Sequence, residues 1–382
     1  MRKWMDSGMG ICNETNIYLY GLGQCSKSFI DWLNGFESDI KIVGALDSFS
    51  KEGGNYYGIH IVSIDSLKET DVVVIAIGSI DSVSEIKTRL IYTRGIKEKC
   101  IYHYLDFIQE VRKKRIIEKY QKENREEYRE VIEFLKAGNP LTVRNLYANP
   151  NKTEYRVFRD DRIPYPYINY LGKKLYLPSD FPFEKDYDGN PIVINIVEND
   201  QYDNSPHLYM KENHQFKGGV LIDAGVAEGN FALKYVDNAD KIFLIESDKK
   251  WLNVLQYTFA PYKDKVIIVP KRLGRKDNRE EITIDSIIGD NECDFIKMDI
   301  EGSEPDALLG GIETLRKNNI KLSICAYHQR YDEKYIRFIL ESLGYDTEVS
   351  HGFMFFQHDD DIDISLDFRR GIVYGKKNKR ET

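Results

Sequence analysis

Cysteine is scarce in this sequence, and its pattern excludes two kinds of motif. The chain has five cysteines among its 382 residues: Cys12, Cys25, Cys100, Cys293 and Cys325. They are odd in number and widely separated, and no two have the CxxC spacing of zinc or redox motifs. We therefore expect reduced cysteines that mostly pack in the protein interior.

Long hydrophobic runs are also missing. The longest are Val72–Ile77 and Ile192–Val197, the second interrupted by Asn195. Both are far shorter than the roughly 20 apolar residues that a transmembrane helix needs. Residues 1–10, MRKWMDSGMG, carry charge but no apolar stretch follows, unlike in a secretory signal. The sequence therefore predicts a cytoplasmic protein without a membrane span.

The chain has no excess of positive charge. Its 54 Lys and Arg stand against 62 Asp and Glu, so the net charge of -8 has the wrong sign for covering nucleic-acid phosphates. We therefore expect no nucleic-acid partner, and we leave homo-oligomer formation open. With 42% hydrophobic and 30% charged residues the composition is that of a globular protein, and the length suggests two or three domains.

Residues 1–106 alternate apolar runs with amphipathic stretches. The alternation predicts a small Rossmann-like domain with a parallel βαβ sheet. The expected strands are 16–20, 40–45 and 71–77, and the expected helix is 26–33.

Residues 107–175 are expected to join this domain to a second one. Up to Leu135 their apolar positions recur at three- and four-residue intervals, which predicts one or two amphipathic helices that end at Ala137–Pro140. Aromatic residues interrupted by prolines follow, from Tyr155 to Tyr187. Because proline interrupts helices, we expect an irregular bridging or lid segment there.

Residues 176–382 are expected to form the second domain. Apolar runs separated by crossover-length segments predict a mainly parallel, doubly wound α/β sheet, in which a closing hairpin reverses one strand. The seven strand candidates are Val220–Ala224, Lys241–Glu246, Val266–Val269, Asp294–Asp299, Lys321–Ala326, Phe353–Phe356 and Ile372–Tyr374.

The sharpest local signal lies at Val220–Phe231, where an apolar strand runs into DAGVAEG. Glycines allow a tight bend and a close approach to a ligand, and Asp223 suits a cationic or hydroxylated one. Glu246 closes the next strand, where an acid can hold both hydroxyls of a ribose. Together the two acids indicate a nucleoside with a positively charged tail, as in S-adenosylmethionine, although each alone also suits a helix cap or a solvated strand end.

Two later segments resemble a known family. The run Asp294–Glu304, DFIKMDIEGSE, preceded by Ile282–Ile287, is similar to the signature of FkbM-type S-adenosylmethionine-dependent methyltransferases. Leu322–His328, LSICAYH, resembles the end of the family's fifth strand. The resemblance covers about residues 202–375 and implies a Rossmann-like seven-stranded methyltransferase sheet.

The resemblance also implies which residues bind the cofactor. The methionine part is expected at the glycine loop, and the ribose at Glu246. Many family members have Asn at the position of Glu228 and Pro at that of Ser247, so these contacts differ here. The implied cofactor residues are Asp223, Gly225, Glu228, Gly229, Phe231, Glu246, Ser247 and Asp299.

Methyl transfer needs an aligned acceptor and a group that takes its proton. His328 follows a buried strand at the carboxyl edge of the sheet and is our first candidate for this base, with His207 second. The resemblance implies that Asp299 and Glu301 face the reacting centre. Glu301 and Tyr327 are expected to contact the acceptor. As a less favoured alternative, Asp299, Glu301 and His328 hold Mg²⁺, provided that the strand stays extended through Ile300. Lys297 is expected to pack in its strand.

The amino-terminal domain has a loose GxGxxG pattern, with Gly21 and Gly23 after a strand and Asp47 after the next one. The domain resembles the nucleotide- or sugar-nucleotide-binding Rossmann-like domains of polysaccharide-modifying enzymes. It either binds a nucleotide or serves as a scaffold. Tyr165 and its aromatic neighbours either pack between the domains or stack on sugars.

These observations favour a methyltransferase that O-methylates a sugar, sugar nucleotide or glycan in polysaccharide biosynthesis. The preference for oxygen and the glycan acceptor come from the resemblance. Two alternatives remain open: an NAD-dependent oxidoreductase that uses Gly21, Gly23 and Asp47, and a non-catalytic scaffold that binds S-adenosylmethionine.

Overall fold

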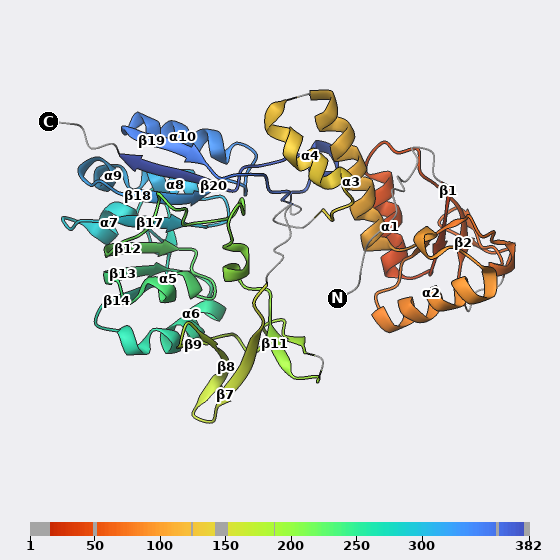
Figure 1. Ribbon diagram of the computed structural model, residues 1–382, viewed down its shortest axis with the longest axis horizontal. Helices are drawn as coiled ribbons and strands as arrows, with labels where there is room; N and C mark the ends of the chain where they lie inside the picture. The colour runs from red at the N-terminus through yellow and green to blue at the C-terminus, as the bar shows by residue number, and fades with distance from the viewer. Residues whose placement is uncertain are drawn as a thin grey trace. The chain divides into compact units, whose positions relative to one another are not determined.

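The chain folds into two compact units, each described here by itself. Figure 1 shows the computed structural model, which describes residues 16–48, 52–123, 125–141, 152–186, 188–356 and 359–377. The first unit comprises Met1–Leu141 and His358–Leu366, and the second comprises Thr142–Gln357 and Asp367–Thr382. The interpretations of residues 1–10 and of Cys12 lie outside the described residues.

The first unit contains the expected small parallel sheet, with the strand order β2-β1-β5-β6. Helices α1 and α2 follow β1 and β5 as crossovers, and apolar side chains from both faces of the sheet form its core. The elements are β1 (Asn16–Tyr20), α1 (Gln24–Asn34), β2 (Lys41–Leu46), β3 (Asn55–Tyr56), β4 (Ile59–His60), β5 (Val72–Ile75), α2 (Ile80–Arg94) and β6 (Ile101–His103).

Two helices that we expected in a joining segment belong to the first unit. These are α3 (Tyr104–Glu123) and α4 (Arg129–Lys136), and α3 buries Phe107 and Val111 against the small sheet. A short helix from far along the sequence, α11 (Ile362–Ser365), belongs to the same unit. Arg112 on α3 forms a two-pronged ion pair with Asp363 on α11, at 2.6 Å for both pairs of atoms.

The aromatic segment belongs to the second unit and is regular, which corrects the expectation of an irregular segment. Its strands are β7 (Tyr155–Asp160), β8 (Ile163–Tyr170), β9 (Lys173–Tyr176), β10 (Glu184–Lys185) and β11 (Pro191–Val193). They form an antiparallel sheet in the order β10-β11-β7-β8-β9. Proline excludes long helices but is compatible with strands, and Pro166 on β8 still accepts a hydrogen bond from the backbone N–H of Leu177.

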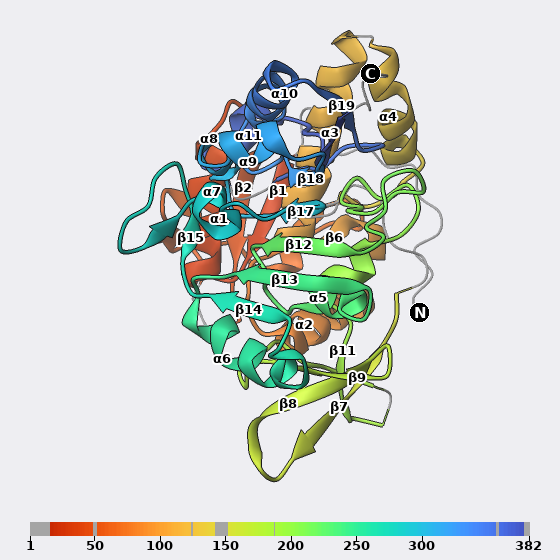
Figure 2. The same ribbon diagram turned by 90° about the vertical axis from the view of Figure 1, so that its left-hand side faces the viewer.

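The second unit also contains the expected seven-stranded sheet, in the order β14-β13-β12-β17-β18-β20-β19. All neighbouring pairs are parallel except those of β20, the one reversed strand. Figure 2 shows β12, β13 and β14 side by side. The strands are β12 (Gly219–Ala224), β13 (Ala239–Ile245), β14 (Val266–Val269), β17 (Phe295–Met298), β18 (Lys321–Cys325), β19 (Tyr345–Val349) and β20 (Ile372–Lys377), and β15 (Arg272–Leu273) pairs with β16 (Glu281–Ile282) outside this sheet.

The sixth strand was predicted at the wrong place. Phe353–Phe355 is buried and Phe356 is partly buried, but the segment forms only an isolated bridge, from Met354 to Arg369. The strand is β19, whose sequence YDTEV alternates between buried and exposed positions because it lies at the edge of the sheet. The expected hairpin is correspondingly wide, and residues 350–371 connect β19 to β20.

Helices cover both faces of the seven-stranded sheet. One face packs against α5 (Asn230–Tyr235) and α6 (Lys249–Thr258), and the other against α7 (Ile284–Ile288), α8 (Glu304–Leu309), α9 (Ile312–Lys317) and α10 (Asp332–Ser342). Side chains alternate between the two faces along each strand, so Phe295 lies in one core and Ile296 in the other. No helix in the described part of the chain is both long and apolar enough to cross a membrane.

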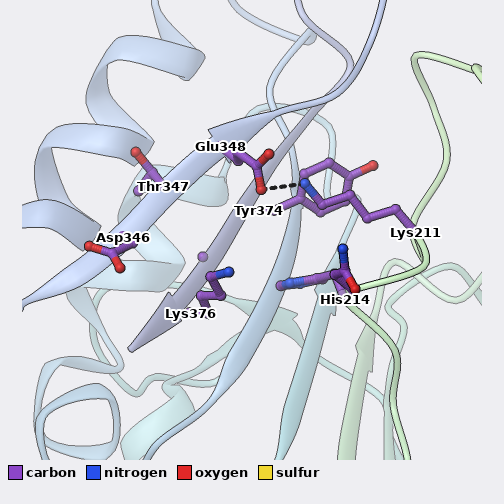
Figure 3. A pocket seen from close by; sticks show the side chains of 9 residues that line it. Lys211, His214, Asp346, Thr347, Glu348, Tyr374 and Lys376 are labelled. Atoms are coloured by element: carbon purple, nitrogen blue, oxygen red, sulfur yellow. Dashed lines mark hydrogen bonds and ion pairs between the residues drawn. The ribbon is translucent and has the colours of Figure 1, made fainter. Parts of the chain in front are cut away.

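A pocket of about 250 Å³ lies beside β19 and β20. Figure 3 shows that its wall includes Lys211, paired with Glu348, and His214. The His214 ring is buried and its Nε2 donates to the carbonyl of Leu322 at 2.9 Å. Burial, together with the nearby charges of Lys321, Lys211 and Lys376, lowers the pKa of His214 to about 4.

We expect His214 to make the fold sensitive to acid. The folded protein holds this imidazole neutral while the unfolded chain protonates it at its ordinary pKa of about 6.5, so stability is lost as pH falls from about 6.5 to 4. The free energy of unfolding is expected to fall by about 3 kcal/mol over this range. Urea denaturation across this pH range is expected to show a smaller fall in the free energy of unfolding for His214→Gln than for the wild type. The control His60→Gln, at an exposed position of β4, is expected to behave like the wild type. If the free energy of unfolding fell with pH by the same amount in His214→Gln and in the wild type, His214 would not be the source of the acid sensitivity.

Candidate functional site

The glycine loop after β12 is shaped by positive φ angles, which are +72° at Gly225, +46° at Ala227 and +83° at Gly229. At Gly225 a side chain is excluded both by the positive φ and by lack of space. A Cβ there would lie 1.7 Å from the backbone oxygen of Asp299. The loop therefore packs directly against the residue that follows β17, at the carboxyl edge of the sheet.

Asp223 and Lys297 form a buried ion pair beneath this loop. They are register partners on β12 and β17, and Lys297 Nζ lies 3.1 Å from Asp223 Oδ1. Nζ also donates to the carbonyl oxygens of Gly225, at 2.6 Å, and Ala224, at 3.4 Å. Burial alone would lower the pKa of Lys297, but the carboxylates of Asp223 and Asp299 outweigh it and raise that pKa, so the ammonium stays charged.

Lys297 therefore does more than the strand packing that we expected from the sequence. Its ammonium is the cation that accompanies a fully buried carboxylate and it fixes two carbonyls of the glycine loop. A lysine inside an otherwise apolar strand was the available signal, since buried charges need partners. Asp223 contacts Lys297, and its direct contact with a methionine part stays a prediction.

Glu246 follows β13 and lies at the next strand end, beside the glycine loop. Its Oε1 accepts hydrogen bonds from the backbone N–H groups of Ser247, at 2.7 Å, and Asp248, at 2.8 Å. Its Oε2 accepts one from the N–H of Ala227 at 3.3 Å. These bonds orient a half-buried carboxylate while leaving lone pairs for a ligand.

Glu228 at the end of the glycine loop and the first residues of α5 complete this part of the site. Glu228 and Phe231 are buried, and the ring of Phe231 lies edge-on to that of Tyr209, with centroids 5.5 Å apart. The side chain of Asn230 is also buried, and its Nδ2 has no hydrogen-bond acceptor among the described residues. The start of α5 therefore presents a buried hydrogen-bond donor next to the loop where the resemblance implies a ligand.

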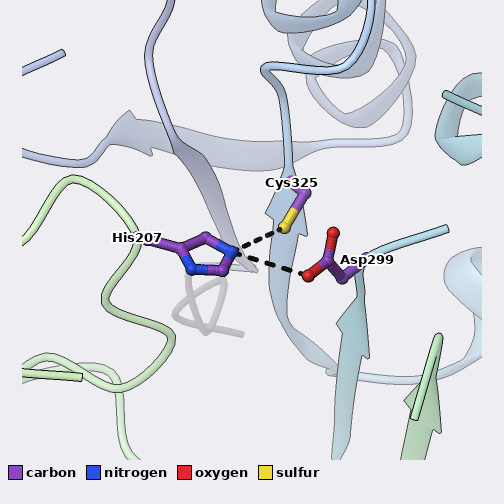
Figure 4. Close-up of side chains that lie close together, drawn as sticks. All are labelled: His207, Asp299 and Cys325. Carbon is purple, nitrogen blue, oxygen red and sulfur yellow. Dashed lines mark hydrogen bonds and ion pairs between the residues drawn. The ribbon is translucent and has the colours of Figure 1, made fainter. Parts of the chain in front are cut away.

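The carboxylate of Asp299 lies just past β17, at the centre of a second group of side chains. Figure 4 draws Asp299 with one member of this group, His207, and with Cys325. Its Oδ2 accepts a hydrogen bond from the Tyr209 hydroxyl at 2.8 Å, and its Oδ1 accepts one from the Tyr327 hydroxyl at 3.2 Å. His207 Nε2 lies 3.5 Å from Oδ2, and His328 Nε2 lies 3.3 Å from Oδ1. Burial alone would raise the pKa of Asp299, but the hydrogen bond to His207 and the charges of His207, His328 and Lys297 hold it well below its usual range.

His328 is enclosed by acids. Its Nδ1 lies 3.0 Å from Glu304 Oε1, and its Nε2 lies near both Asp299 and Glu301. Burial opposes the charged form, but the hydrogen bond to Glu304 and the three carboxylates raise the pKa of His328 to about 9. A protonated imidazole has no free lone pair to accept a proton, which favours a positioning role for His328 over that of a base.

The chain turns sharply where the magnesium alternative needed an extended strand. β17 ends at Met298, Glu301 has a φ of +56°, and 81% of the Glu301 side chain is exposed. Two groups among the described residues have metal-ligand spacing: His207, Asp299 and Cys325; and Asp299, Glu304 and His328. Both contain Asp299 and neither contains Glu301.

Sequence reasoning missed two residues of the site besides Lys297. Tyr209 is buried and donates to Asp299, and Glu304 is buried, pairs with His328 and accepts from the backbone N–H of Ile300 at 2.9 Å. Both lie within the segments that supplied His207 and Asp299. Their roles depend on contacts between distant segments, which the sequence pattern does not contain.

The two glycines predicted to bind a nucleotide, Gly21 and Gly23, follow β1. Gly21 has a φ of +104°, and a Cβ there would lie 3.1 Å from the carbonyl oxygen of Ala76, so close strand packing requires this glycine. Gly23 precedes α1, and Asp47 follows β2. A nucleotide-binding role for Gly21, Gly23 and Asp47 stays a prediction.

A comparison with protein families finds a match within the second unit. Residues 180–347 match the model of the methyltransferase FkbM domain. This part of the second unit is similar to an FkbM methyltransferase domain, and we refer to it below as the FkbM domain. The match spans the glycine loop, Glu246, Asp299 and His328, and it supports S-adenosylmethionine as the methyl donor.

The solved structures that match this chain include several methyltransferases. The methyltransferase FkbM from Methylobacillus flagellatus KT is 18% identical with a TM-score of 0.42, over 95% of this chain and 90% of that chain. Precorrin-6y C5,15-methyltransferase from Geobacter metallireducens GS-15 is 15% identical with a TM-score of 0.31, over 52% of this chain and 96% of that one. TrmK from M. capricolum, in complex with S-adenosyl-homocysteine, is 14% identical with a TM-score of 0.26, over 42% of this chain and 63% of that one. No curated protein gives a significant match.

We expect the FkbM domain to depend on the charge of Lys297 for its stability. Lys297→Met leaves the buried Asp223 carboxylate without its cation, which is expected to lower the free energy of unfolding by about 3–5 kcal/mol. The double variant Asp223→Leu/Lys297→Met removes both charges and is expected to recover most of this loss. Urea denaturation measures the free energy of unfolding of the wild type, the single variant and the double variant.

Lys249→Met is the matched control, because Lys249 is exposed at the start of α6. Its free energy of unfolding is expected to stay within about 0.5 kcal/mol of the wild type. A double variant no more stable than Lys297→Met would contradict the ion-pair explanation.

Proposed function

We propose that this protein transfers the methyl group of S-adenosylmethionine to a hydroxyl oxygen of a sugar, sugar nucleotide or glycan. The observation that carries the proposal is the carboxylate of Glu246, oriented by three backbone N–H groups beside the glycine loop. A carboxylate at this strand end suits the two hydroxyls of a ribose. The FkbM family match supports the same cofactor.

The residues of the loop fit this cofactor chemically. Gly225 and Gly229 keep side chains away from the turn, and the buried Nδ2 of Asn230 offers a hydrogen bond that no described residue accepts. We propose that Asn230 and the loop backbone bind the methionine part, with Asp223 and Lys297 fixing the loop from below. Bound there, S-adenosylmethionine supplies an electrophilic methyl group.

The acceptor side of the proposal rests on the group around Asp299. Two tyrosine hydroxyls and two imidazoles orient its carboxylate, which retains 16% exposure while His207 and His328 are almost fully buried. We propose that an acceptor hydroxyl binds against Asp299 and that His328 holds Asp299 and Glu301 in place by its charge. Tyr327 and Glu301 then border the acceptor.

The choice of a sugar rests on resemblance. FkbM-type enzymes suggest oxygen as the methylated atom, and the first unit resembles domains of polysaccharide-modifying enzymes. Its four-stranded parallel sheet, with Gly21 at the end of β1, is compatible with holding the nucleotide of a sugar nucleotide.

The test combines binding and turnover on the full-length protein. Native mass spectrometry is expected to detect co-purified or added S-adenosylhomocysteine, and a panel of sugar nucleotides with methyl-labelled S-adenosylmethionine is expected to yield a labelled, O-methylated sugar. Tight binding of NAD without any response to S-adenosylhomocysteine would overturn the proposal in favour of an oxidoreductase. Cofactor binding without transfer to any member of a broad acceptor panel would favour a non-catalytic scaffold.

We expect Glu246→Gln to weaken the binding of S-adenosylhomocysteine. The substitution keeps the shape of the side chain but removes the charge and one acceptor oxygen for the ribose hydroxyls. A loss of about 1–3 kcal/mol, at least about fivefold in Kd, is expected by isothermal titration calorimetry. Glu280→Gln, at an exposed position of the same unit, is expected to bind like the wild type. Equal affinities for Glu246→Gln and the wild type would remove Glu246 from the cofactor site.

A further inference from the structure

Three side chains of different chemistry meet in the FkbM domain (Figure 4). His207 Nε2 lies 3.5 Å from Asp299 Oδ2 and 3.6 Å from Cys325 Sγ, and the three donor atoms all lie within 4.8 Å of one another. His207 and Cys325 are buried, and the Asp299 side chain is 16% exposed. The group therefore has a closed interior and one partly open side.

Strand register brings two of these residues together. Met298 on β17 pairs with Ile324 on β18, so the next residues, Asp299 and Cys325, are neighbours at the ends of two parallel strands. Side-chain alternation directs Cys325 to the same face as Phe295, away from Ile324. The strands thus fix an oxygen ligand and a sulfur ligand next to each other.

Hydrogen bonds hold the loop that contributes His207. The carbonyl of Tyr209 accepts from the hydroxyl of Ser323 on β18 at 2.7 Å, and the carbonyl of His207 accepts from Gln201 Nε2, also at 2.7 Å. The ring of His207 makes its polar contacts through Nε2, since Nδ1 has no hydrogen-bond partner among the described residues. Nε2, on a fixed loop, therefore faces the thiol, the carboxylate and the Tyr209 hydroxyl, which lies 3.2 Å away.

The distances within the group also fit an ion between these atoms. An N–H···O hydrogen bond usually spans about 2.7–3.2 Å, so the contact of 3.5 Å between His207 and Asp299 is a long one. Two ligands of a tetrahedral zinc ion, with bonds of about 2.0–2.3 Å, lie roughly 3.3–3.6 Å apart. Both distances from His207 Nε2 match that spacing.

We infer that His207, Asp299 and Cys325 form a binding site for a divalent transition-metal ion of the zinc type. Imidazole and thiolate are ligands that zinc accepts, whereas magnesium and calcium require oxygen. The Tyr209 and Tyr327 hydroxyls, both hydrogen-bonded to Asp299, orient its carboxylate in the way that outer-shell groups orient metal ligands.

The second group with metal-ligand spacing is less suitable. It shares Asp299 but adds His328 and Glu304, which already pair with each other at 3.0 Å. Glu304 also accepts the backbone N–H of Ile300. An ion there would have to displace contacts that hold the turn after β17.

Three protein ligands leave one position of a tetrahedral ion open, as in catalytic zinc sites. Resting on the proposed function, we place the acceptor hydroxyl at that position. The ion would lower the pKa of the hydroxyl, whose proton passes to solvent water. The oxygen then forms a bond to the methyl carbon as the carbon–sulfur bond of the donor breaks, leaving S-adenosylhomocysteine as a neutral thioether.

The test measures metal binding directly on the full-length protein. The protein is stripped with a chelator, incubated with Zn²⁺ and desalted, and about one zinc ion per chain is expected by elemental mass spectrometry. With Co²⁺ in place of Zn²⁺, a thiolate-to-cobalt charge-transfer band is expected in the near ultraviolet. Cys325→Ser is expected to abolish this band, and Cys325→Ser and His207→Ala are each expected to weaken Zn²⁺ binding at least about tenfold.

Cys293→Ser is the matched control, because Cys293 is a buried cysteine of the same unit outside the group. It is expected to keep both the zinc and the charge-transfer band. Circular dichroism verifies that each variant is folded, and Asp299→Asn gives a second ligand variant if Cys325→Ser is not. Wild-type protein that retains no zinc, or a charge-transfer band that persists in Cys325→Ser, would overturn the inference.

Calorimetry with S-adenosylhomocysteine separates this inference from the proposed function. Protein that binds S-adenosylhomocysteine but no zinc would overturn the metal site and leave the methyltransferase proposal standing. Protein that binds zinc through Cys325 but no S-adenosylhomocysteine would support the metal site and overturn the cofactor assignment.

Discussion

The site in the FkbM domain depends on a buried ammonium group, that of Lys297. In the sheet interior a charge is tolerated only with partners, and Lys297 has an acid on the neighbouring strand and two carbonyls of the glycine loop. The same strand continues into Asp299, whose backbone oxygen leaves no room for a side chain at Gly225. One cation thus connects the loop proposed for the cofactor to the carboxylate proposed for the acceptor.

Several side chains contact the two carboxylate oxygens of Asp299 at the same time. Tyrosines and histidines reach its two oxygens from loops that are far apart in sequence, and the acids around His328 hold that imidazole in turn. Such networks are costly when incomplete, because a single lost partner leaves a buried charge. The carboxylate is therefore held in one orientation before any ligand arrives.

The sequence predicted those parts of the fold whose signal is local. β12, β17 and β18 lie inside a parallel sheet covered on both faces, so each appears as a short apolar run. β19 was missed because an edge strand alternates polar and apolar residues, whereas Phe353–Phe356 was mistaken for a strand because a buried connection is equally apolar. The strand-end acids Asp223, Glu246 and Asp299 could be found in the same local way, since each follows or closes an apolar run. Lys297 and Tyr209 could not, because their roles arise from contacts with residues far along the chain.

Because helix α11 belongs to the first unit, each unit consists of two separate stretches of the sequence. Residues 358–366 lie within the stretch of the second unit, yet they complete the first, where Asp363 binds Arg112. Neither unit is thus encoded by one continuous stretch of its gene. A recombination event that exchanged either unit as a cassette would have to bring two separate pieces of coding sequence together, so the pair is expected to be inherited as a single block.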